Sequence, residues 1–238
     1  MLITYLATLT KKTILSEGVY YLSCSLPSDE TWTYEAGQYM IFHVPTDHAM
    51  RSLRRLYSIA SSPTNKNTVD FIIEMVPNGM GSKYIQELAV NDTVTLQGPA
   101  GVFTYKPSTR NPIFLATGTG IAPMYSIITD LIIQKSNKQL QLFWGMKYKK
   151  DLYLIDELAA LAKQSDTFTY SVCLSRERDV DNTSCILGRV TDGLTNLTSN
   201  FSNFDYYLCG GKEMVESLRS FLLEHNVPKE QVYFEKFT

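Results

Sequence analysis

Residues that bind metals are few in this chain, and they show no ligand spacing. Its 238 residues include four cysteines and three histidines. The cysteines form no C-x-x-C pair, so neither a zinc site nor an iron–sulfur cluster on this chain is expected, and free thiols are typical of a reducing compartment. No G-x-S-x-G turn is present, and serine-hydrolase chemistry is therefore not indicated. These cysteines and histidines are Cys24, Cys173, Cys185, Cys209, His43, His48 and His225.

Long apolar runs and long charged runs are also absent. No stretch of about eighteen apolar residues occurs, so we expect no membrane insertion. Residues 1–9 have no positive residue ahead of their apolar stretch, which argues against a secretory signal. Charged residues make up 19% of the chain, the formal net charge is -2, and basic residues form no stripe that would attract nucleic acid. We expect a cytoplasmic monomer.

Short β-rich runs broken by turn residues occupy the first half of the chain. They cover residues 3–9, 19–25, 39–44, 69–75 and 93–96, a spacing that is typical of a barrel or sandwich. One helix is expected near residues 82–89, because Ser82 is a good N-cap residue and apolar residues follow it at helical spacing. This half is predicted to be a domain of residues 1–106.

After a link at residues 107–112 that contains two prolines, the pattern of apolar residues changes. This change predicts a second domain at residues 110–238. In that half, buried-type strands alternate with helices, and this alternation predicts a parallel sheet with helices on both faces. The expected strands are residues 113–116, 140–144, 168–174 and 206–209, and the expected helices are residues 124–134, 154–163 and 213–224.

A glycine turn between a strand and a helix is the most informative feature of the second half. Residues 115–123 read Leu-Ala-Thr-Gly-Thr-Gly-Ile-Ala-Pro, in which Gly118 and Gly120 allow the backbone to approach the phosphates of a dinucleotide. The segment departs from G-x-G-x-x-G by ending in Pro123. A lone turn of this kind is more often structural than functional.

In the first half, residues 55–61 place a guanidinium, an aromatic ring and a hydroxyl within four positions of an expected strand. Alternation puts Arg55 and Tyr57 on one side of that strand. A flavin nucleotide uses such groups, since its pyrophosphate suits an arginine fork and its ring suits an aromatic plane. The spacing alone favours the simpler interpretation, an exposed basic loop at residues 51–55 beside an ordinary strand.

Taken together and in this order, the two segments resemble the ferredoxin–NADP reductase family, in which R-x-Y-S-x-x-S binds flavin and G-T-G-x-A-P contacts the nicotinamide nucleotide. Further segments in the family's order extend the resemblance over nearly the whole chain. They are A-G-Q-Y at residues 36–39, V-P-N-G-M-G-S at 76–82, G-P-A-G-V-F at 98–103 and L-C-G-G at 208–211. The resemblance implies a two-domain α+β fold, with a six-stranded antiparallel Greek-key barrel followed by an α/β nucleotide-binding domain.

The resemblance also assigns roles by position. Arg55 is expected to hold the FAD pyrophosphate, Tyr57 to stack on the flavin, and Ser58 to lie near flavin N5. Catalytic roles are implied for Ser58, Cys209 and Glu235. The residues expected to contact FAD are Arg55, Leu56, Tyr57, Ser58, Ile73, Gly81, Ser82, Thr119 and Phe237. Those expected to contact NAD(P)H are Gly118, Gly120, Lys147, Ser175, Arg176, Arg189, Cys209 and Gly210.

The last residues resemble the family's terminal E-x-aromatic pattern. In this interpretation Phe237 covers the flavin face that nicotinamide must reach, and Glu235 is a nearby carboxylate. Phe237 lacks a phenol and is followed by Thr238, so weaker stacking and easier displacement by nicotinamide are expected. A frayed, solvated terminus is the alternative.

The choice of coenzyme depends on the 2'-phosphate, a dianion that requires several donors close together. Ser175 and Arg176 follow an expected strand, with Lys147 and Arg189 as further basic candidates, and this favours NADPH over NADH. Glu177 offers the alternative of a carboxylate that meets a ribose hydroxyl, which would suit NADH.

The implied activity is that of an FAD-dependent oxidoreductase, a flavoprotein that takes hydride from NAD(P)H and passes electrons to a separate acceptor such as a ferredoxin, a flavodoxin or the iron–sulfur centre of an oxygenase. Two alternatives remain. One is an NAD(P)H-dependent free-flavin reductase, which releases its flavin after reduction. The other is an idle binding module that keeps the fold, although the intact glycines and Ser58 argue against it.

Overall fold

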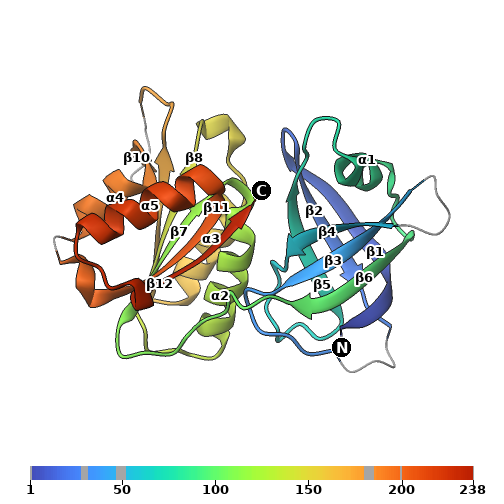
Figure 1. Cartoon of the computed structure of the whole chain (residues 1–238), viewed down its shortest axis with the longest axis horizontal. Helices are drawn as coiled ribbons and strands as arrows, with labels where there is room; N and C mark the ends of the chain where they lie inside the picture. The colour runs from blue at the N-terminus through green and yellow to red at the C-terminus, as the bar shows by residue number, and fades with distance from the viewer. Residues whose placement is uncertain (1, 28–31, 47–51, 180–184, 199, 238) are drawn as a thin grey trace. The chain divides into compact units, whose positions relative to one another are not determined.

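The structure is a computed structural model that describes residues 2–27, 32–46, 52–179, 185–198 and 200–237. Contacts divide the chain into two compact units (Figure 1). The first, called the barrel unit, contains Met1–Tyr105 and Tyr125–Asp130. The second, called the sheet unit, contains Lys106–Met124 and Leu131–Thr238. Each unit has its own sheet and its own hydrophobic core, and each is described separately.

The barrel unit is built on a six-stranded antiparallel sheet. Its strands are β1 (Ile3–Ser16), β2 (Val19–Ser25), β3 (Tyr39–Pro45), β4 (Ser52–Ser58), β5 (Thr68–Glu74) and β6 (Thr93–Ala100). They lie in the order β4-β3-β6-β1-β2-β5, in which β6 crosses over to lie between β3 and β1. An antiparallel bridge between Ile59 and Phe71 joins the two ends of this order and closes the sheet.

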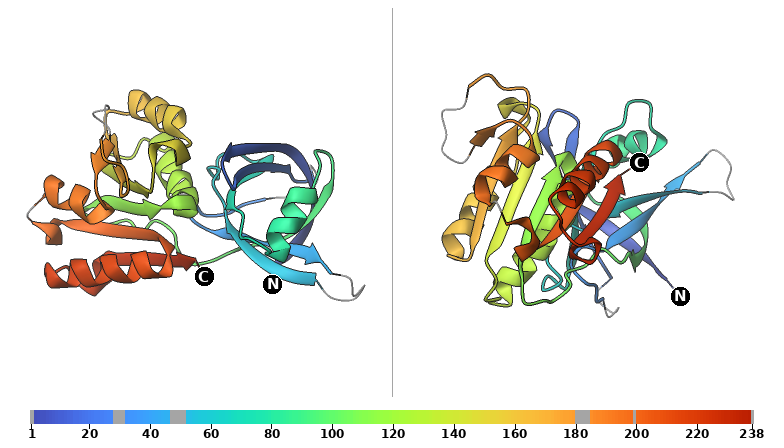
Figure 2. Two further views of the ribbon diagram at one scale, coloured as in Figure 1. Left: turned by 90° about the horizontal axis from the view of Figure 1, so that it is seen from above. Right: turned by 60° about the vertical axis from the view of Figure 1, so that its left-hand side comes forward.

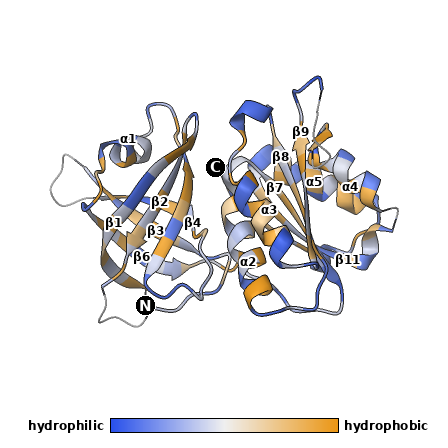
Figure 3. Cartoon of the chain, turned by 180° about the vertical axis from the view of Figure 1, so that it is seen from behind, coloured by the Kyte–Doolittle hydropathy of each residue, from blue (hydrophilic) through white to orange (hydrophobic). Residues whose placement is uncertain are grey.

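The strands of the barrel unit bury alternate residues. Along β1, Tyr5, Ala7 and Leu9 are buried while their neighbours face outward, as expected for strands that present one face to a core. Orange hydrophobic and blue hydrophilic segments alternate along these strands in Figure 3. The core also holds Trp32 and Phe42, so its aromatic residues come from several elements.

Helix α1 (Met80–Glu87) is the only helix among the described residues before Tyr105. The prediction that Ser82 caps this helix was wrong, because the helix begins at Met80 and its N-cap is Gly79. The Ser82 hydroxyl instead accepts a hydrogen bond from the Val76 backbone N–H at 2.7 Å, inside the first helical turn. At the other end of α1, Lys12 Nζ donates to the carbonyl oxygens of residues 86 and 88 at 2.8 and 2.7 Å.

The sheet unit is a six-stranded parallel sheet. Its strands are β7 (Asn111–Thr117), β8 (Leu140–Met146), β9 (Phe168–Leu174), β10 (Cys185–Leu187), β11 (Phe204–Gly211) and β12 (Val232–Phe237), in the order β10-β9-β8-β7-β11-β12. The helices after Tyr105 are α2 (Ile121–Ile133), α3 (Ile155–Gln164), α4 (Val190–Leu197) and α5 (Lys212–Glu224). The middle of α2, Tyr125–Asp130, is grouped by its contacts with the barrel unit. In the left view of Figure 2, the green and yellow helices α2 and α3 lie on one side of this sheet, and the orange and red α4 and α5 lie on the other.

Strand β7 is the point at which the strand order reverses. The chain proceeds outward from β7 through β8, β9 and β10 on one side, and then returns to add β11 and β12 on the other. In open parallel sheets, ligands bind beyond the carboxyl ends of the strands at this reversal. This rule predicts a ligand site at the end of β7, next to the end of β11.

The predicted fold class is confirmed, with an antiparallel sheet followed by a parallel one. The sequence interpretation did not include β10, α4 or β12. The alternative of a frayed terminus was wrong up to Phe237, because β12 pairs with β11 from Val232 to Phe237. Thr238 lies outside the described residues.

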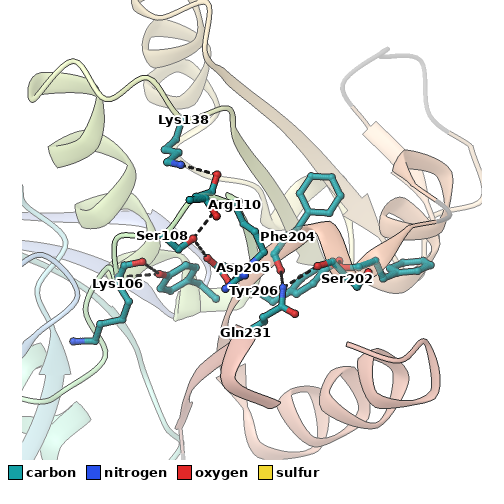
Figure 4. A network of polar contacts seen from close by, with 12 residues as sticks. Lys106, Ser108, Arg110, Lys138, Ser202, Phe204, Asp205, Tyr206 and Gln231 are labelled. Atoms are coloured by element: carbon teal, nitrogen blue, oxygen red, sulfur yellow. Dashed lines mark hydrogen bonds and ion pairs between the residues drawn. The ribbon is translucent and has the colours of Figure 1, made fainter. Parts of the chain in front are cut away.

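A polar network anchors the start of β7 to β11 at the amino edge of the sheet (Figure 4). Asp205 is 2% exposed and accepts hydrogen bonds from the Ser108 hydroxyl and from Arg110 Nε, the latter at 2.7 Å. The Arg110 backbone N–H in turn donates to the Ser108 hydroxyl at 3.0 Å. Each oxygen of the buried Asp205 carboxylate therefore has a hydrogen-bond donor, which a charge inside a protein requires.

Candidate functional site

Strand β4 presents the first group of candidate residues. Arg55 and Tyr57 lie on the same face, across from Phe42 and Met40 of β3, while Leu56 points the other way and is 56% exposed. The Tyr57 ring meets the Phe42 ring edge-on with centroids 4.9 Å apart. Packing against the barrel core therefore fixes the orientation of Tyr57. Burial raises the pKa of its hydroxyl, and the Arg55 charge opposes that rise.

The first turn of α1 packs directly against this face of β4. A Cβ atom at Gly81 would lie 2.9 Å from the Tyr57 hydroxyl oxygen and 3.0 Å from Arg55 Cγ, so only glycine lets the main chain approach so closely. The fold thus brings together three of the residues expected to contact FAD. Together they form a cradle of backbone, guanidinium and aromatic ring.

Ser82 adds a hydroxyl donor to the cradle. Its oxygen accepts from the Val76 N–H, and its own proton can still be donated to an acceptor. The first turn of α1 also carries the positive end of the helix dipole, which favours an anion. Lys12 stabilises the negative end of the same helix through two carbonyl oxygens. The cradle therefore fits a phosphate group.

The other residues expected to contact FAD lie in different surroundings. Ser58 is buried at the end of β4. Ile73 is 1% exposed and belongs to the barrel core, so a contact of this residue with a flavin would be made by its main chain. Thr119 and Phe237 belong to the sheet unit.

The glycine turn in the sheet unit forms a short 3-10 turn, η1 (Gly118–Gly120), between β7 and α2. Gly118 has φ of +52°, a conformation that favours glycine. A Cβ atom at Gly120 would lie 2.2 Å from the Cys209 carbonyl oxygen, so the turn packs against the main chain of β11. The first amides of a helix have no partner within it, and here they follow the reversal point of the sheet.

Strand β11 ends beside this turn. A Cβ atom at Gly210 would lie 2.4 Å from Thr117 Oγ1, and the φ of Gly210 is +152°. Cys209 is fully buried and is paired with Glu235 of β12. Burial raises the pKa of the Cys209 thiol well above its usual value, and the Glu235 carboxylate raises it further, so the thiol is neutral.

Phe237 pairs with Gly211 at the last position of β12 and is partly buried. It therefore lies at the carboxyl edge of the sheet, close to the end of β11. This placement brings the terminal aromatic residue to the same edge as the glycine turn.

The candidate residues for coenzyme choice follow three neighbouring parallel strands. Lys147 follows β8, Ser175 and Arg176 follow β9, and Arg189 lies two residues beyond β10, so all four are at the carboxyl edge. The Arg176 backbone N–H donates to the Lys147 carbonyl oxygen at 3.0 Å, and both side chains are exposed. These residues suit an anionic group bound at that edge.

Glu177, the alternative for a ribose contact, accepts a hydrogen bond from the Lys149 backbone N–H at 2.7 Å. Its carboxylate is thus held against the start of the short turn η2 (Lys149–Asp151). One oxygen of Glu177 is already engaged by the protein.

Sequence reasoning missed two residues that support these sites. Lys12 lies on β1, far in sequence from the helix end that it contacts. Trp144, on β8, donates its indole N–H to the Gly118 carbonyl oxygen at 3.0 Å. Neither residue belongs to a recognisable motif, so only the fold reveals their positions.

Other classes of site are not found in the described part of the chain. It holds no group of three or more histidine, cysteine or acidic residues arranged to bind a metal ion. None of its helices combines the length and apolar character needed to cross a membrane.

Two protein-family models match the chain in order. The oxidoreductase FAD-binding domain covers residues 6–105, and the oxidoreductase NAD-binding domain covers residues 114–220. The chain is also 31% identical over 234 residues to the toluate 1,2-dioxygenase electron transfer component of Pseudomonas putida, a match that covers 98% of the chain and 67% of that protein. The chain belongs to the ferredoxin reductase-like family of FAD- and NAD-binding oxidoreductases.

Other members of the ferredoxin reductase-like family support this assignment. The reductase component of propane 2-monooxygenase from a Gordonia species is 27% identical over 228 residues, which cover 94% of this chain and 65% of that protein. The chain thus spans about two thirds of the length of these relatives. A ferredoxin NADP+ reductase structure from Neisseria gonorrhoeae, with bound FAD and NADP, has the same fold, with a TM-score of 0.82 at 22% identity over 99% of this chain and 98% of that one.

Proposed function

We propose that this protein binds FAD, accepts hydride from a nicotinamide nucleotide and passes electrons to a separate protein acceptor. The observation that carries the proposal is the cradle formed by Arg55, Tyr57 and Gly81 beside Ser82, in a chain that also places a glycine turn at the reversal point of a parallel sheet. When bound, FAD supplies the chemistry that converts a two-electron donor into a source of single electrons.

In the barrel unit, Arg55, Gly81 and Ser82 would hold the FAD pyrophosphate. The guanidinium fork and the Ser82 hydroxyl provide hydrogen-bond donors, and α1 provides the positive end of its dipole. Tyr57 would pack against the flavin ring, and Ser58 would provide a hydroxyl near N5. Leu56, Ile73, Thr119 and Phe237 are proposed to complete the FAD contacts.

In the sheet unit, Gly118, Gly120 and Gly210 would let the main chain approach the pyrophosphate of the nicotinamide nucleotide. We favour NADPH, because Lys147, Ser175, Arg176 and Arg189 are gathered along one edge, where a 2'-phosphate would find several donors. Two domains, at residues 1–106 and 110–238, would carry the two nucleotides in a monomer.

The protein's contribution to hydride transfer would be alignment rather than acid or base catalysis. Cys209 would approach the nicotinamide as a neutral thiol, because its raised pKa excludes a thiolate at neutral pH. Glu235 would set the charge next to it, and Phe237 would be displaced by the arriving nicotinamide.

The proposed acceptor is a separate ferredoxin, flavodoxin or oxygenase component. Two relatives are named as the electron transfer component of a dioxygenase and the reductase component of a monooxygenase. We extend that role to this chain as part of the proposal.

The test of FAD binding compares two neighbouring arginines on opposite faces of β4. Arg55→Ala is expected to weaken FAD binding by about 10- to 100-fold, since hydrogen bonds to charged groups contribute about 1.5–3 kcal/mol each. Arg54, which bonds to Gln97 at 2.7 Å, points the other way, so Arg54→Ala should retain FAD. Absorbance of the purified variants and fluorescence titration with FAD measure both outcomes.

Two results would contradict the proposal. One is a wild-type chain that cannot be loaded with FAD, and the other is equal loss of FAD from the two arginine variants. A wild-type protein that releases its flavin after each turnover and reduces free riboflavin as well as FAD would instead identify a free-flavin reductase.

Coenzyme choice is tested by Arg176→Ala. We expect a lower kcat/KM for NADPH and an unchanged value for NADH, because only NADPH carries the 2'-phosphate. Lys163→Ala is the matched control, since Lys163 lies in the last turn of α3 and its loss removes the same charge from another element. Equal losses with both coenzymes in Arg176→Ala would refute the preference for NADPH.

A further inference from the structure

Trp144 is the largest fully buried side chain of the sheet unit, and its polar group is directed at the glycine turn. It lies on β8, is fully buried and packs edge-on against Tyr153 with ring centroids 4.9 Å apart. Its indole N–H donates to the Gly118 carbonyl oxygen at 3.0 Å. The same oxygen also accepts the backbone N–H of Ile121. The carbonyl therefore has two donors, one from the turn itself and one from a neighbouring strand.

We propose that Trp144 is a positioning residue for nicotinamide-nucleotide binding. In a trans peptide group, the C=O of one residue and the N–H of the next point in opposite directions. Because the indole holds the Gly118 carbonyl toward β8, it directs the Thr119 N–H away from β8. The Thr119 amide belongs to η1, the turn before α2, where a pyrophosphate is expected. Trp144 would therefore act on the ligand through the main chain.

The packing around the turn agrees with this role. Gly118 adopts φ of +52°, and Gly120 is in close contact with the Cys209 carbonyl of β11. The turn is therefore held by β11 on one side and by the indole from β8 on the other. A glycine-rich segment has many accessible backbone conformations, and such fixed contacts select one of them.

Without the indole, the Gly118 carbonyl still has a donor in the Ile121 N–H, which it shares with the Thr119 carbonyl. Loss of the indole N–H would thus leave no buried carbonyl without a donor. A phenylalanine at residue 144 would also keep an aromatic ring against Tyr153. These two features separate the positioning role from a general contribution to stability.

The inference rests on the proposed function, and its test uses the FAD-loaded full chain. In Trp144→Phe, the dissociation constants of NADP+ and NAD+ are each expected to rise about fivefold, as loss of one ordering hydrogen bond implies. Both should rise by the same factor, because the turn would meet the pyrophosphate that the two nucleotides share. Arg176→Ala would instead separate them. Isothermal titration calorimetry measures both constants, and FAD absorbance measures retained flavin.

Trp32→Phe is the matched control. The chain has two tryptophans, and Trp32 lies in the barrel core, where its indole N–H has no partner within the described part of the chain. The same chemical change there should leave nucleotide affinity unaltered. A Trp144→Phe variant that keeps its FAD and binds both nucleotides as tightly as the wild type overturns the inference. Absence of nucleotide binding by the wild type would overturn the proposed function instead.

A second measurement avoids reliance on the folding of Trp144→Phe. In the ¹⁵N-labelled protein, the indole N–H signal that remains in Trp32→Phe belongs to Trp144. We expect this signal to shift, and its exchange with solvent to slow, when NADP+ reaches saturation. A signal that does neither, at a concentration at which calorimetry shows full occupancy, overturns the inference.

Discussion

The main chain at Gly81 packs so closely against the side chain of Arg55 that a Cβ atom at residue 81 would lie 3.0 Å from Arg55 Cγ. This contact joins the first turn of α1 to β4, two elements that are separated in sequence by the whole of β5. It makes the glycine a part of the phosphate cradle, because a larger residue would displace the guanidinium.

Gly81→Ala is therefore expected to weaken FAD binding by about tenfold, in line with about 1–3 kcal/mol for overpacking at a tightly packed site. The new methyl group would also lie 2.9 Å from the Tyr57 hydroxyl. Removing that hydroxyl in Gly81→Ala/Tyr57→Phe should restore part of the affinity. Fluorescence titration with FAD measures these two variants and Tyr57→Phe alone, and additive losses in the double variant would disprove the steric explanation.

Two glycines at the carboxyl edge of the parallel sheet, Gly120 and Gly211, allow a comparison of a crowded and an open position. Gly120→Ala is expected to destabilise the protein by about 3 kcal/mol, the upper end for overpacking, because its Cβ would lie 2.2 Å from the Cys209 carbonyl oxygen, a main-chain atom that cannot move alone. Gly211→Ala should cost at most about 1 kcal/mol, the loss of a preferred N-cap residue of α5, since no atom lies within 4 Å of its Cβ position and its φ is -60°. Urea unfolding measures both, and similar losses in the two variants would contradict the crowding argument.

The buried carboxylate of Asp205 is expected to contribute more to stability than a surface carboxylate. Asp205→Asn removes the charge that accepts from Arg110 and Ser108, so the free energy of unfolding should fall by about 2 kcal/mol. Glu216→Gln is the control, since Glu216 pairs with Lys236 at 3.1 Å on the surface and its loss should cost at most about 0.5 kcal/mol. Chemical denaturation at low salt checks the difference, and equal losses would show that the network in Figure 4 contributes no more than a surface pair.

Segments in which local chemistry decides the conformation were predictable from sequence. The alternation around Arg55 and Tyr57 gave the shared face of β4, and the glycines at 118 and 120 gave the turn between β7 and α2. Both patterns depend on neighbouring residues in the chain. The change near residue 107, from short β-rich runs to strands that alternate with helices, predicted an antiparallel sheet followed by a parallel one. This change is also a local pattern of the sequence.

Features set by distant contacts were not predictable. The expected N-cap at Ser82 failed because the Val76 N–H competes for the serine hydroxyl and the helix starts two residues earlier. The last strand, β12, is stable because it pairs with β11, although its sequence resembles a mobile end. In the sequence, Trp144 looks like any other strand residue. Its role becomes visible only in the fold, where β8 pairs with β7 and so lies beside the turn that follows β7. Each of these positions depends on tertiary packing rather than on local propensity.

Because of its buried thiols, the free energy of unfolding of the protein is expected to depend on pH in the alkaline range. Burial raises the pKa of Cys24 to about 12, with a further contribution from Asp70, and burial together with the Asp192 charge raises the pKa of Cys173 to about 12. An unfolded thiol has a pKa of 9.0, so the native state keeps protons that the unfolded state releases. The thiols' contribution is complete below pH 9 and is lost as the pH rises toward 12.

The free energy of unfolding should therefore fall steadily once the pH exceeds 9, by at most about 1.4 kcal/mol per thiol per pH unit. Measurements from pH 8 to pH 10, in the presence of a reductant, also include the start of a similar effect from the buried tyrosines, whose usual pKa is 10.0, so the thiols are isolated by comparison with a variant that keeps those tyrosines. In Cys24→Ala/Cys173→Ala, the stability at pH 8 should be lower because two side chains are truncated, but its slope between pH 9 and pH 10 should be shallower. An unchanged slope in this variant would mean that the two thiols do not cause the loss.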